Sequence, residues 1–124
     1  MQKIIVTGGL GFIGSNLIKI LLQKNYYVIN LDKISYASSF YNVKDFKNSK
    51  NYKFIKCDIS RKGKWIEHFN KTNWVFHFAA LADIIPSIEN PKNYFSTNVN
   101  GTLNVLQACR QNNLKKIIYA ASSS

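Results

Sequence analysis

The chain has 124 residues, enough for one domain, and 46% of them are apolar, which supplies one hydrophobic core and excludes a disordered tail. No run of 18 apolar residues is present, so we expect no membrane span. The two cysteines, Cys57 and Cys109, stand alone, so neither a disulfide scaffold nor a metal site is predicted. The N-terminus lacks the layout of a signal peptide, and we expect a cytoplasmic protein with free thiols.

Seventeen basic residues against six acidic ones give the chain a formal net charge of +11. Such a charge is typical of proteins that bind nucleic acids. Fifteen of the basic residues are lysines, however, and only Arg61 and Arg110 offer the forked guanidinium that phosphate and base recognition favours. We therefore expect a lysine-rich solvated surface and no nucleic-acid partner.

Short apolar runs alternate along the chain with segments of helical spacing. The first run, 3–7, leads through a glycine-rich loop into a predicted helix at 13–24, whose apolar stripe comprises Ile13, Leu17, Ile20 and Leu21. In chain order there follow a strand at 26–31, a short helix at 42–47, a strand at 53–57, a short helix at 61–71, a strand at 74–78, a long helix at 94–112 that carries Val99, Leu103, Leu106 and Cys109, and a strand at 116–120. The alternation predicts an α/β fold, a doubly wound (Rossmann) parallel sheet of five strands in the order 3-2-1-4-5 with helices on both faces.

The loop between the first strand and the first helix carries a phosphate-binding pattern. Gly9, Gly11 and Gly14 match the pattern G-x-G-x-x-G. Gly8, Gly11 and Gly14 match the looser pattern G-x-x-G-x-x-G. One glycine makes a tight turn, one lets a pyrophosphate approach the backbone, and one lets the helix pack on the strand. Asp32, at the end of the second strand, is placed to bond both adenosine ribose hydroxyls; the alternative is that it only caps a loop.

The same aspartate bears on the choice of cofactor. A carboxylate at position 32 repels a 2′-phosphate, so NAD is favoured over NADP. Lys33, a neighbouring cation, weakens this preference slightly.

From residues 7–14 the chain resembles the extended short-chain dehydrogenase/reductase family, and more specifically its NAD-dependent nucleotide-sugar epimerases and dehydratases. Four further stretches agree, at 57–59, 77–80, 98–102 and 119–122. The resemblance covers all 124 residues but only the N-terminal portion of a family member. It implies that Asp58 holds the adenine amino group, that 77–80 runs under the cofactor, and that His77 is structural.

The resemblance and the glycine motif together give a set of candidate residues. The candidate catalytic residue is Ser122, which would hydrogen-bond the C4 oxygen of the sugar. The candidate NAD-binding residues are Gly8, Gly11, Phe12, Ile13, Gly14, Asp32, Lys33, Asp58, Ile59, Phe78, Ala79, Ala80 and Asn98.

The family's catalytic Tyr-x-x-x-Lys pair, which follows the fifth strand, is not found in these residues. One such string does occur, from Tyr52 to Lys56, but it belongs to the predicted third strand, where residues four apart are about 13 Å from each other. We expect the chain alone to be inactive, an incomplete NAD-binding domain over 1–124 without the domain that binds the nucleotide sugar.

Two reactions remain open for the complete enzyme. Residues 122–124 are three serines, where the resemblance places Thr-Asp-Glu in sugar 4,6-dehydratases, and without a carboxylate the elimination lacks its base. We therefore favour a nucleotide-sugar 4-epimerase, which transfers a hydride transiently at C4. The stretch 32–37 resembles the dehydratases instead, so a 4,6-dehydratase is the alternative. A non-catalytic dinucleotide-binding module or fragment is a further one.

The chain ends after the fifth strand, whereas sheets of this type usually continue. A sheet truncated there exposes an unpaired edge with Ile117, Ile118 and Tyr119, and such edges invite pairing with another chain. We therefore expect self-association, or a partner fragment, at the fifth-strand edge.

Overall fold

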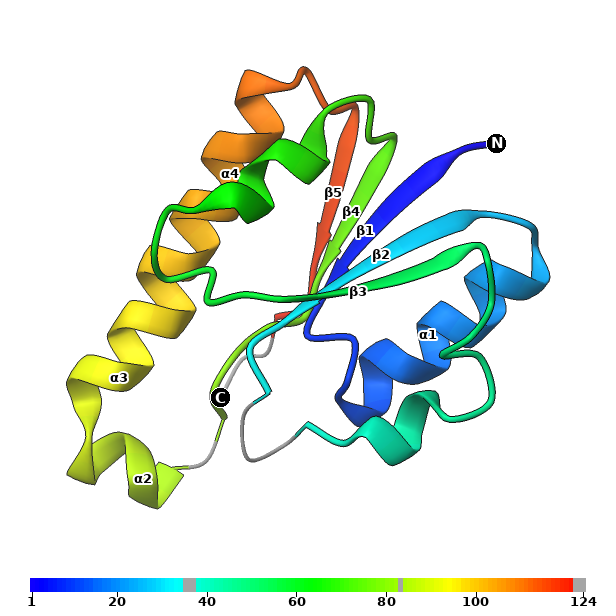
Figure 1. Ribbon diagram of the computed structural model, residues 1–124. Coiled ribbons are helices and arrows are strands. Elements are labelled where there is room, and N and C mark those ends of the chain that lie inside the picture. Colours follow the sequence, from blue (N-terminus) through cyan, green and yellow to red (C-terminus); the bar gives the residue numbers. More distant parts are fainter. Residues whose placement is uncertain (35–37, 83, 122–124) are drawn as a thin grey trace.

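The computed structural model describes residues 1–34, 38–82 and 84–121. These residues form one sheet of five parallel strands, in the order β3-β2-β1-β4-β5 (Figure 1). The strands are β1 (Lys3–Thr7), β2 (Tyr27–Asp32), β3 (Tyr52–Lys56), β4 (Trp74–His77) and β5 (Lys116–Tyr119). The predicted fold class and strand order are confirmed, and each strand lies within one residue of its predicted position.

Helices cover both faces of the sheet (Figure 1). The helical elements are α1 (Phe12–Gln23), the 3₁₀ turns η1 (Phe40–Val43) and η2 (Lys64–Phe69), α2 (Ile84–Glu89), α3 (Pro91–Phe95), the π-helical turn η3 (Ser96–Asn100) and α4 (Gly101–Gln111). The predicted helix at 94–112 is thus interrupted by η3, and the predicted helices at 42–47 and 61–71 are shorter 3₁₀ segments. No helix in the described part of the chain has the length and apolar character needed to cross a bilayer.

Two apolar layers hold the helices to the sheet, because successive strand residues face opposite sides. Ile4 and Val6 of β1 pack with Ile18 and Leu21 of α1 on one face. On the other face, the core cluster includes Ile5, Ile29, Leu31, Trp65, Phe69, Val75, Val105 and Ala108. The central strands β1 and β2 are therefore buried on both sides, which leaves the carboxyl edge of the sheet as the place for a ligand.

The predicted apolar stripe of the first helix is wrong at two positions. Ile13 and Ile20 are 66% and 48% exposed, whereas Gly14, Ser15 and Ile18 are buried. The two small residues bring the start of α1 against the glycine loop, and this contact sets which helix face meets the sheet. A pattern of large apolar residues does not register a contact made by glycine and serine.

The long helical segment likewise buries a different face from the one its large side chains mark. Val105, Ala108 and Cys109 are buried, while Val99, Leu103 and Leu106 are each about half exposed. A row of apolar side chains is therefore accessible along η3 and α4.

Candidate cofactor site

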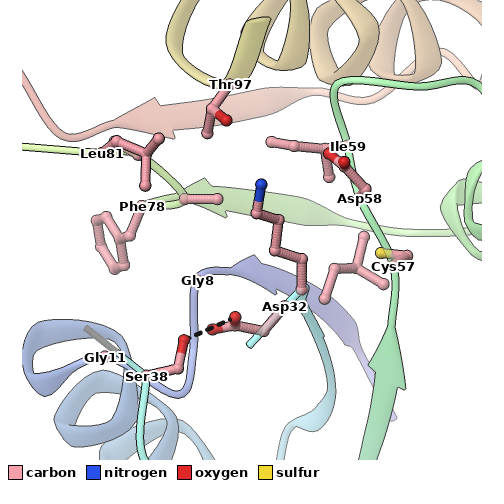
Figure 2. Close-up of a pocket in the computed structure, with 14 residues that line it drawn as sticks. Gly8, Gly11, Asp32, Ser38, Cys57, Asp58, Ile59, Phe78, Leu81 and Thr97 are labelled. Atoms are coloured by element: carbon pink, nitrogen blue, oxygen red, sulfur yellow. Dashed lines mark hydrogen bonds between the residues drawn. The ribbon is translucent and has the colours of Figure 1, made fainter. Parts of the chain in front are cut away.

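A cleft opens at the carboxyl edge of the sheet, where β1, β2, β3 and β4 end (Figure 2). Its lining comes from the glycine loop, the end of β2, the loop after β3, the segment after β4, and η3. The lining residues are Gly8, Gly11, Leu31, Asp32, Lys33, Ser38, Cys57, Asp58, Ile59, Phe78, Ala79, Ala80, Leu81 and Thr97.

The glycine loop is fixed to β2 by three successive backbone amides. The N–H groups of residues 8, 9 and 10 donate to Leu31 O (2.8 Å), Asn30 Oδ1 (2.9 Å) and Asp32 Oδ2 (3.0 Å). The side chain of the buried Asn30 also donates through Nδ2 to Tyr52 Oη at 3.0 Å, which ties the loop to β3. The loop is therefore held in place by three strands before any ligand binds.

Each glycine of the looser pattern has a distinct structural reason. Gly8 has φ +75°, and a Cβ there would lie 2.7 Å from Ala79 N. A Cβ on Gly14 would lie 2.6 Å from Gly8 O, so this position lets α1 pack against the loop. Among the described residues, a Cβ on Gly11 would meet only Gly8 O, at 3.3 Å. Gly11 thus lines the cleft at a position where a ligand has room to approach the backbone.

The carboxylate of Asp32 is buried and already holds two loops. Oδ2 accepts from Leu10 N, while Oδ1 accepts from Ile34 N (2.8 Å) and from the Ser38 hydroxyl (3.0 Å; Figure 2). The loop-capping role considered for Asp32 is therefore real. A carboxylate has about four lone-pair sites, and the fourth, on Oδ2, has no partner among the described residues.

The loop after β3 supplies a second acid. Burial opposes ionisation of Asp58, but hydrogen bonds from the hydroxyl and amide of Ser60, with the charge of Lys33, hold the pKa of this carboxyl below its usual value. The neighbouring Cys57 behaves oppositely, because burial and then the carboxylates of Asp32 and Asp58 raise the pKa of its thiol to about 12. The cleft thus contains an ionised acceptor beside a neutral thiol.

His77, at the end of β4, is buried between two hydroxyls. Its Nδ1 lies 2.6 Å from Thr7 Oγ1 and its Nε2 lies 2.8 Å from Thr102 Oγ1. Thr102 donates its own proton to Asn98 O at 2.7 Å, so it accepts from Nε2–H, and Thr7 donates to Nδ1. Burial lowers the pKa of His77 to about 4, so the ring is neutral at pH 7 and links β1 to α4.

The segment after β4 is clamped from both sides. Thr7 Oγ1 accepts from the amides of Phe78 and Ala79, each at 3.1 Å. The Asn98 side chain pairs with the backbone of Leu81, accepting from its N–H and donating to its C=O, both at 2.8 Å. Asn98 therefore positions the cleft wall and does not line the cleft.

Most of the expected cofactor residues do meet at this cleft: Gly8, Gly11, Asp32, Lys33, Asp58, Ile59, Phe78, Ala79 and Ala80. Gly14 packs beneath the loop, and the side chains of Phe12 and Ile13 are 77% and 66% exposed outside the lining. Ser122, the expected catalytic residue, lies outside the described residues. The Tyr-x-x-x-Lys string from Tyr52 to Lys56 forms strand β3, as predicted.

Five lining residues were not predicted from the sequence: Leu31, Ser38, Cys57, Leu81 and Thr97. Thr97 is the most informative of them. It sits on the π-helical turn η3, a feature often found at functional sites, and its hydroxyl is buried with no hydrogen-bond partner among the described residues. A buried hydroxyl at a cleft wall needs a hydrogen-bond partner, which a bound ligand or a water molecule could supply.

The sequence of the chain is similar to those of known nucleotide-sugar enzymes. Residues 5–124 match the profile of a family described as GDP-mannose 4,6 dehydratase. Over 98% of its length the chain is 36% identical to a dTDP-D-glucose 4,6-dehydratase from Homo sapiens, and over 99% it is 33% identical to a bifunctional UDP-glucose 4-epimerase and UDP-xylose 4-epimerase from Pisum sativum. The chain spans 36% and 37%, respectively, of the length of these two proteins.

Solved structures of both 4-epimerases and 4,6-dehydratases are also similar to this chain. A UDP-N-acetylglucosamine 4-epimerase from Methanobrevibacter ruminantium superposes with a TM-score of 0.90 at 34% identity, over 98% of this chain and 38% of that one. A dTDP-glucose 4,6-dehydratase from Streptomyces venezuelae, solved with NAD bound, superposes with a TM-score of 0.86 at 30% identity, over 94% of this chain and 38% of that one. The similarity therefore extends to both reaction types.

Proposed function

The chain belongs to the NAD-dependent epimerase/dehydratase family of extended short-chain dehydrogenases/reductases, and we propose on this basis that its cleft binds NAD. The observation that carries the proposal is the glycine loop fixed beside Asp32 at the carboxyl edge of a parallel sheet.

The residues present fit a dinucleotide. Gly11 is the N-cap of α1 and carries no side chain that could cap the helix, so the amides of its first turn are left to a ligand. Together with the positive end of the helix dipole, these amides suit a pyrophosphate, and the absence of a Cβ at Gly11 permits its close approach. The amides of Phe12 and Ile13, rather than their exposed side chains, would make these bonds.

The adenosine half fits the opposite end of the cleft. The open lone pair of Asp32 would accept from a ribose hydroxyl, and the neighbouring Ser38 hydroxyl offers a second polar partner. Asp58 would accept from the adenine amino group. A 2′-phosphate would face the buried carboxylate of Asp32, and Lys33 offsets this only in part, so we propose NAD rather than NADP.

When bound, the cofactor would accept a hydride from C4 of a nucleotide sugar and return it. The chain's own residues bind the pyrophosphate, read the ribose and adenine, and hold the wall at 78–81 in place through Thr7 and Asn98. His77 is not the proton acceptor, because both ring nitrogens are engaged by threonines. We assign the complete reaction to 4-epimerisation because residues 122–124 carry no carboxylate.

A 4,6-dehydratase is the second candidate. The matching family profile is named for a 4,6-dehydratase, and the stretch at 32–37 resembles those enzymes. Sequence beyond residue 124 in the same reading frame would decide between the two, through the acid–base groups it supplies.

Calorimetric titration of the folded chain with NAD and with NADP tests the proposal. We expect NAD to bind, and NADP to bind at least tenfold more weakly. Equal or tighter binding of NADP would contradict the role of Asp32. A folded chain that binds neither dinucleotide would contradict the site itself.

A further inference from the structure

Helix α4 contacts the cleft wall through a side chain that does not line the cleft. The amide Nδ2 of Asn104 donates to the backbone oxygen of Ile59 at 2.8 Å, across 45 residues of sequence. Ile59 and its neighbour Asp58 both line the cleft, in the loop through which the chain passes from β3 to the α4 side of the sheet (Figures 1 and 2).

A second contact joins the same loop to the same helix. A Cβ on Gly101, one turn before Asn104, would lie 2.9 Å from Cγ1 and 3.0 Å from Cδ1 of Ile59. The Ile59 side chain, which is 5% exposed, therefore rests directly on the helix backbone. Residues three apart lie on one face of a helix, so the loop is fastened at two adjacent points.

The Asp58 carboxylate lies one residue before this point of attachment and has one oxygen available to a ligand. Asp58 Oδ1 accepts both hydrogen bonds from Ser60, and no hydrogen bond to Oδ2 occurs among the described residues. An ionised carboxylate only accepts, so Oδ2 selects a donor on the ligand. Adenine presents an amino donor at its position 6, whereas hypoxanthine presents a carbonyl oxygen there, which a carboxylate repels.

We propose that Asn104 is a positioning residue for adenine recognition: its bond to Ile59 O holds the Asp58–Ile59 loop where Asp58 meets the adenine amino group. The inference rests on the proposed NAD site. It assigns a role in base selectivity to a helix residue that does not itself line the cleft.

The test compares NAD with its hypoxanthine analogue by calorimetric titration of the 124-residue chain. Asn104→Asp keeps the side-chain shape but replaces the donor with an acceptor that repels Ile59 O. Gln107→Glu, at an exposed position of the same helix, makes the same change of charge and is the matched control. Circular dichroism establishes that each variant is folded.

We expect the original chain to prefer NAD over the analogue about tenfold, because one hydrogen bond to a charged group is gained and a repulsion avoided. Asn104→Asp should lower NAD affinity about five- to tenfold and analogue affinity less than twofold, so that the preference is lost. Gln107→Glu should keep the preference.

A merely structural role for Asn104 would lower both affinities by the same factor, and that result overturns the inference, as does an unchanged preference. A chain that binds both dinucleotides equally well also overturns it, while leaving the NAD site standing. Failure of the unmodified chain to bind either one instead rejects the proposed function. If Asn104→Asp does not fold, the neutral Asn104→Leu, which also lacks the donor, is expected to lose the preference in the same way.

Discussion

At position 77 a histidine is held neutral between two threonine hydroxyls, and this arrangement has a consequence for stability. Burial lowers the pKa of His77 from 6.5 to about 4 in the folded chain. Between these two values the unfolded chain binds a proton that the folded chain does not, so the free energy of unfolding falls as the pH drops. The contribution of His77 is on the order of 3 kcal/mol between pH 7 and pH 4.

Urea unfolding at pH 7 and pH 4.5 measures this effect. His77→Gln should remove most of the pH dependence that titration of a histidine causes. His68→Gln is the control, because His68 is less buried and should leave most of that dependence in place. An NMR titration in which the His77 ring takes up its proton near pH 6.5 in the folded chain would contradict the buried network.

Thr97 offers a residue-scale test of the ligand's position. Thr97→Val keeps the shape of the side chain and removes a buried hydroxyl that has no partner in the described part of the chain, so the free energy of unfolding should stay equal or rise slightly. If that hydroxyl bonds the cofactor, NAD affinity should fall roughly five- to tenfold. Thr102→Val is the contrasting variant, since it deprives His77 of its acceptor and should lower the free energy of unfolding by about 1–3 kcal/mol. Unchanged NAD affinity in Thr97→Val would remove this residue from the site.

At the scale of elements, two glycines of the glycine loop should affect different properties: Gly14 the stability of the chain, and Gly11 the binding of NAD. Gly14→Ala places a Cβ 2.6 Å from Gly8 O and should destabilise the chain by about 1–3 kcal/mol. Gly11→Ala meets only Gly8 O, at 3.3 Å, so the chain should keep most of its stability. Its methyl group would, however, occupy the approach of the pyrophosphate, and NAD affinity should fall at least tenfold. Thermal unfolding and titration of both variants check the contrast; a Gly11→Ala chain that binds NAD normally would refute it.

The positions of the elements could be predicted because short apolar runs and glycine punctuation are local signals. The strands and the placement of Asp32 at the end of β2 follow from these signals, whereas Asp58 was singled out by the family resemblance. Helix faces could not be predicted in the same way, since α1 meets the glycine loop through Gly14 and Ser15 and exposes Ile13. Small residues at a contact leave no mark in a hydrophobic pattern.

Contacts between residues that are far apart in the chain could not be predicted from the sequence either. Thr97 reaches the cleft wall from the π-helical turn η3, which ordinary helical spacing does not anticipate. Asn98, which was expected to bind cofactor, holds the backbone of Leu81 through both ends of its side-chain amide. An asparagine can serve either role, and only the position of its partner in space distinguishes them.

At the scale of the whole molecule, the two sheet edges differ. β3 presents the exposed Lys53 and Lys56 at one edge, whereas β5 carries an exposed lysine only at its start, Lys116, and then exposes Ile118 (38%) and Tyr119 (55%). Charged edges resist pairing with another chain and apolar ones favour it. We predict self-association through β5 that strengthens as salt screens the net charge of +11.

Analytical ultracentrifugation at low and high salt measures this association, and Ile118→Lys should reduce it. A chain that stays monomeric at both salt concentrations would show that the β5 edge does not pair.

A nucleotide-sugar turnover assay tests whether the chain alone is active. The only Tyr-x-x-x-Lys string of the 124 residues lies on β3, so we expect no C4 epimerisation of UDP-sugars by the chain alone when the reaction is followed by NMR. Turnover at ordinary rates, about 1 to 1,000 per second, would mean that another residue serves as the base.

The central claim, that NAD binds at the cleft, is tested most directly by residue-resolved NMR of the ¹⁵N-labelled chain during titration with NAD. NAD is an anion and the chain carries a net charge of +11, so binding has to be located as well as detected. We predict that the largest shifts occur at the amides of Gly8 to Gly14, of Asp32 and Asp58, and of Thr97. Shifts confined to the lysine-rich surface around Lys62 and Lys64, with an unaffected glycine loop, would contradict the account.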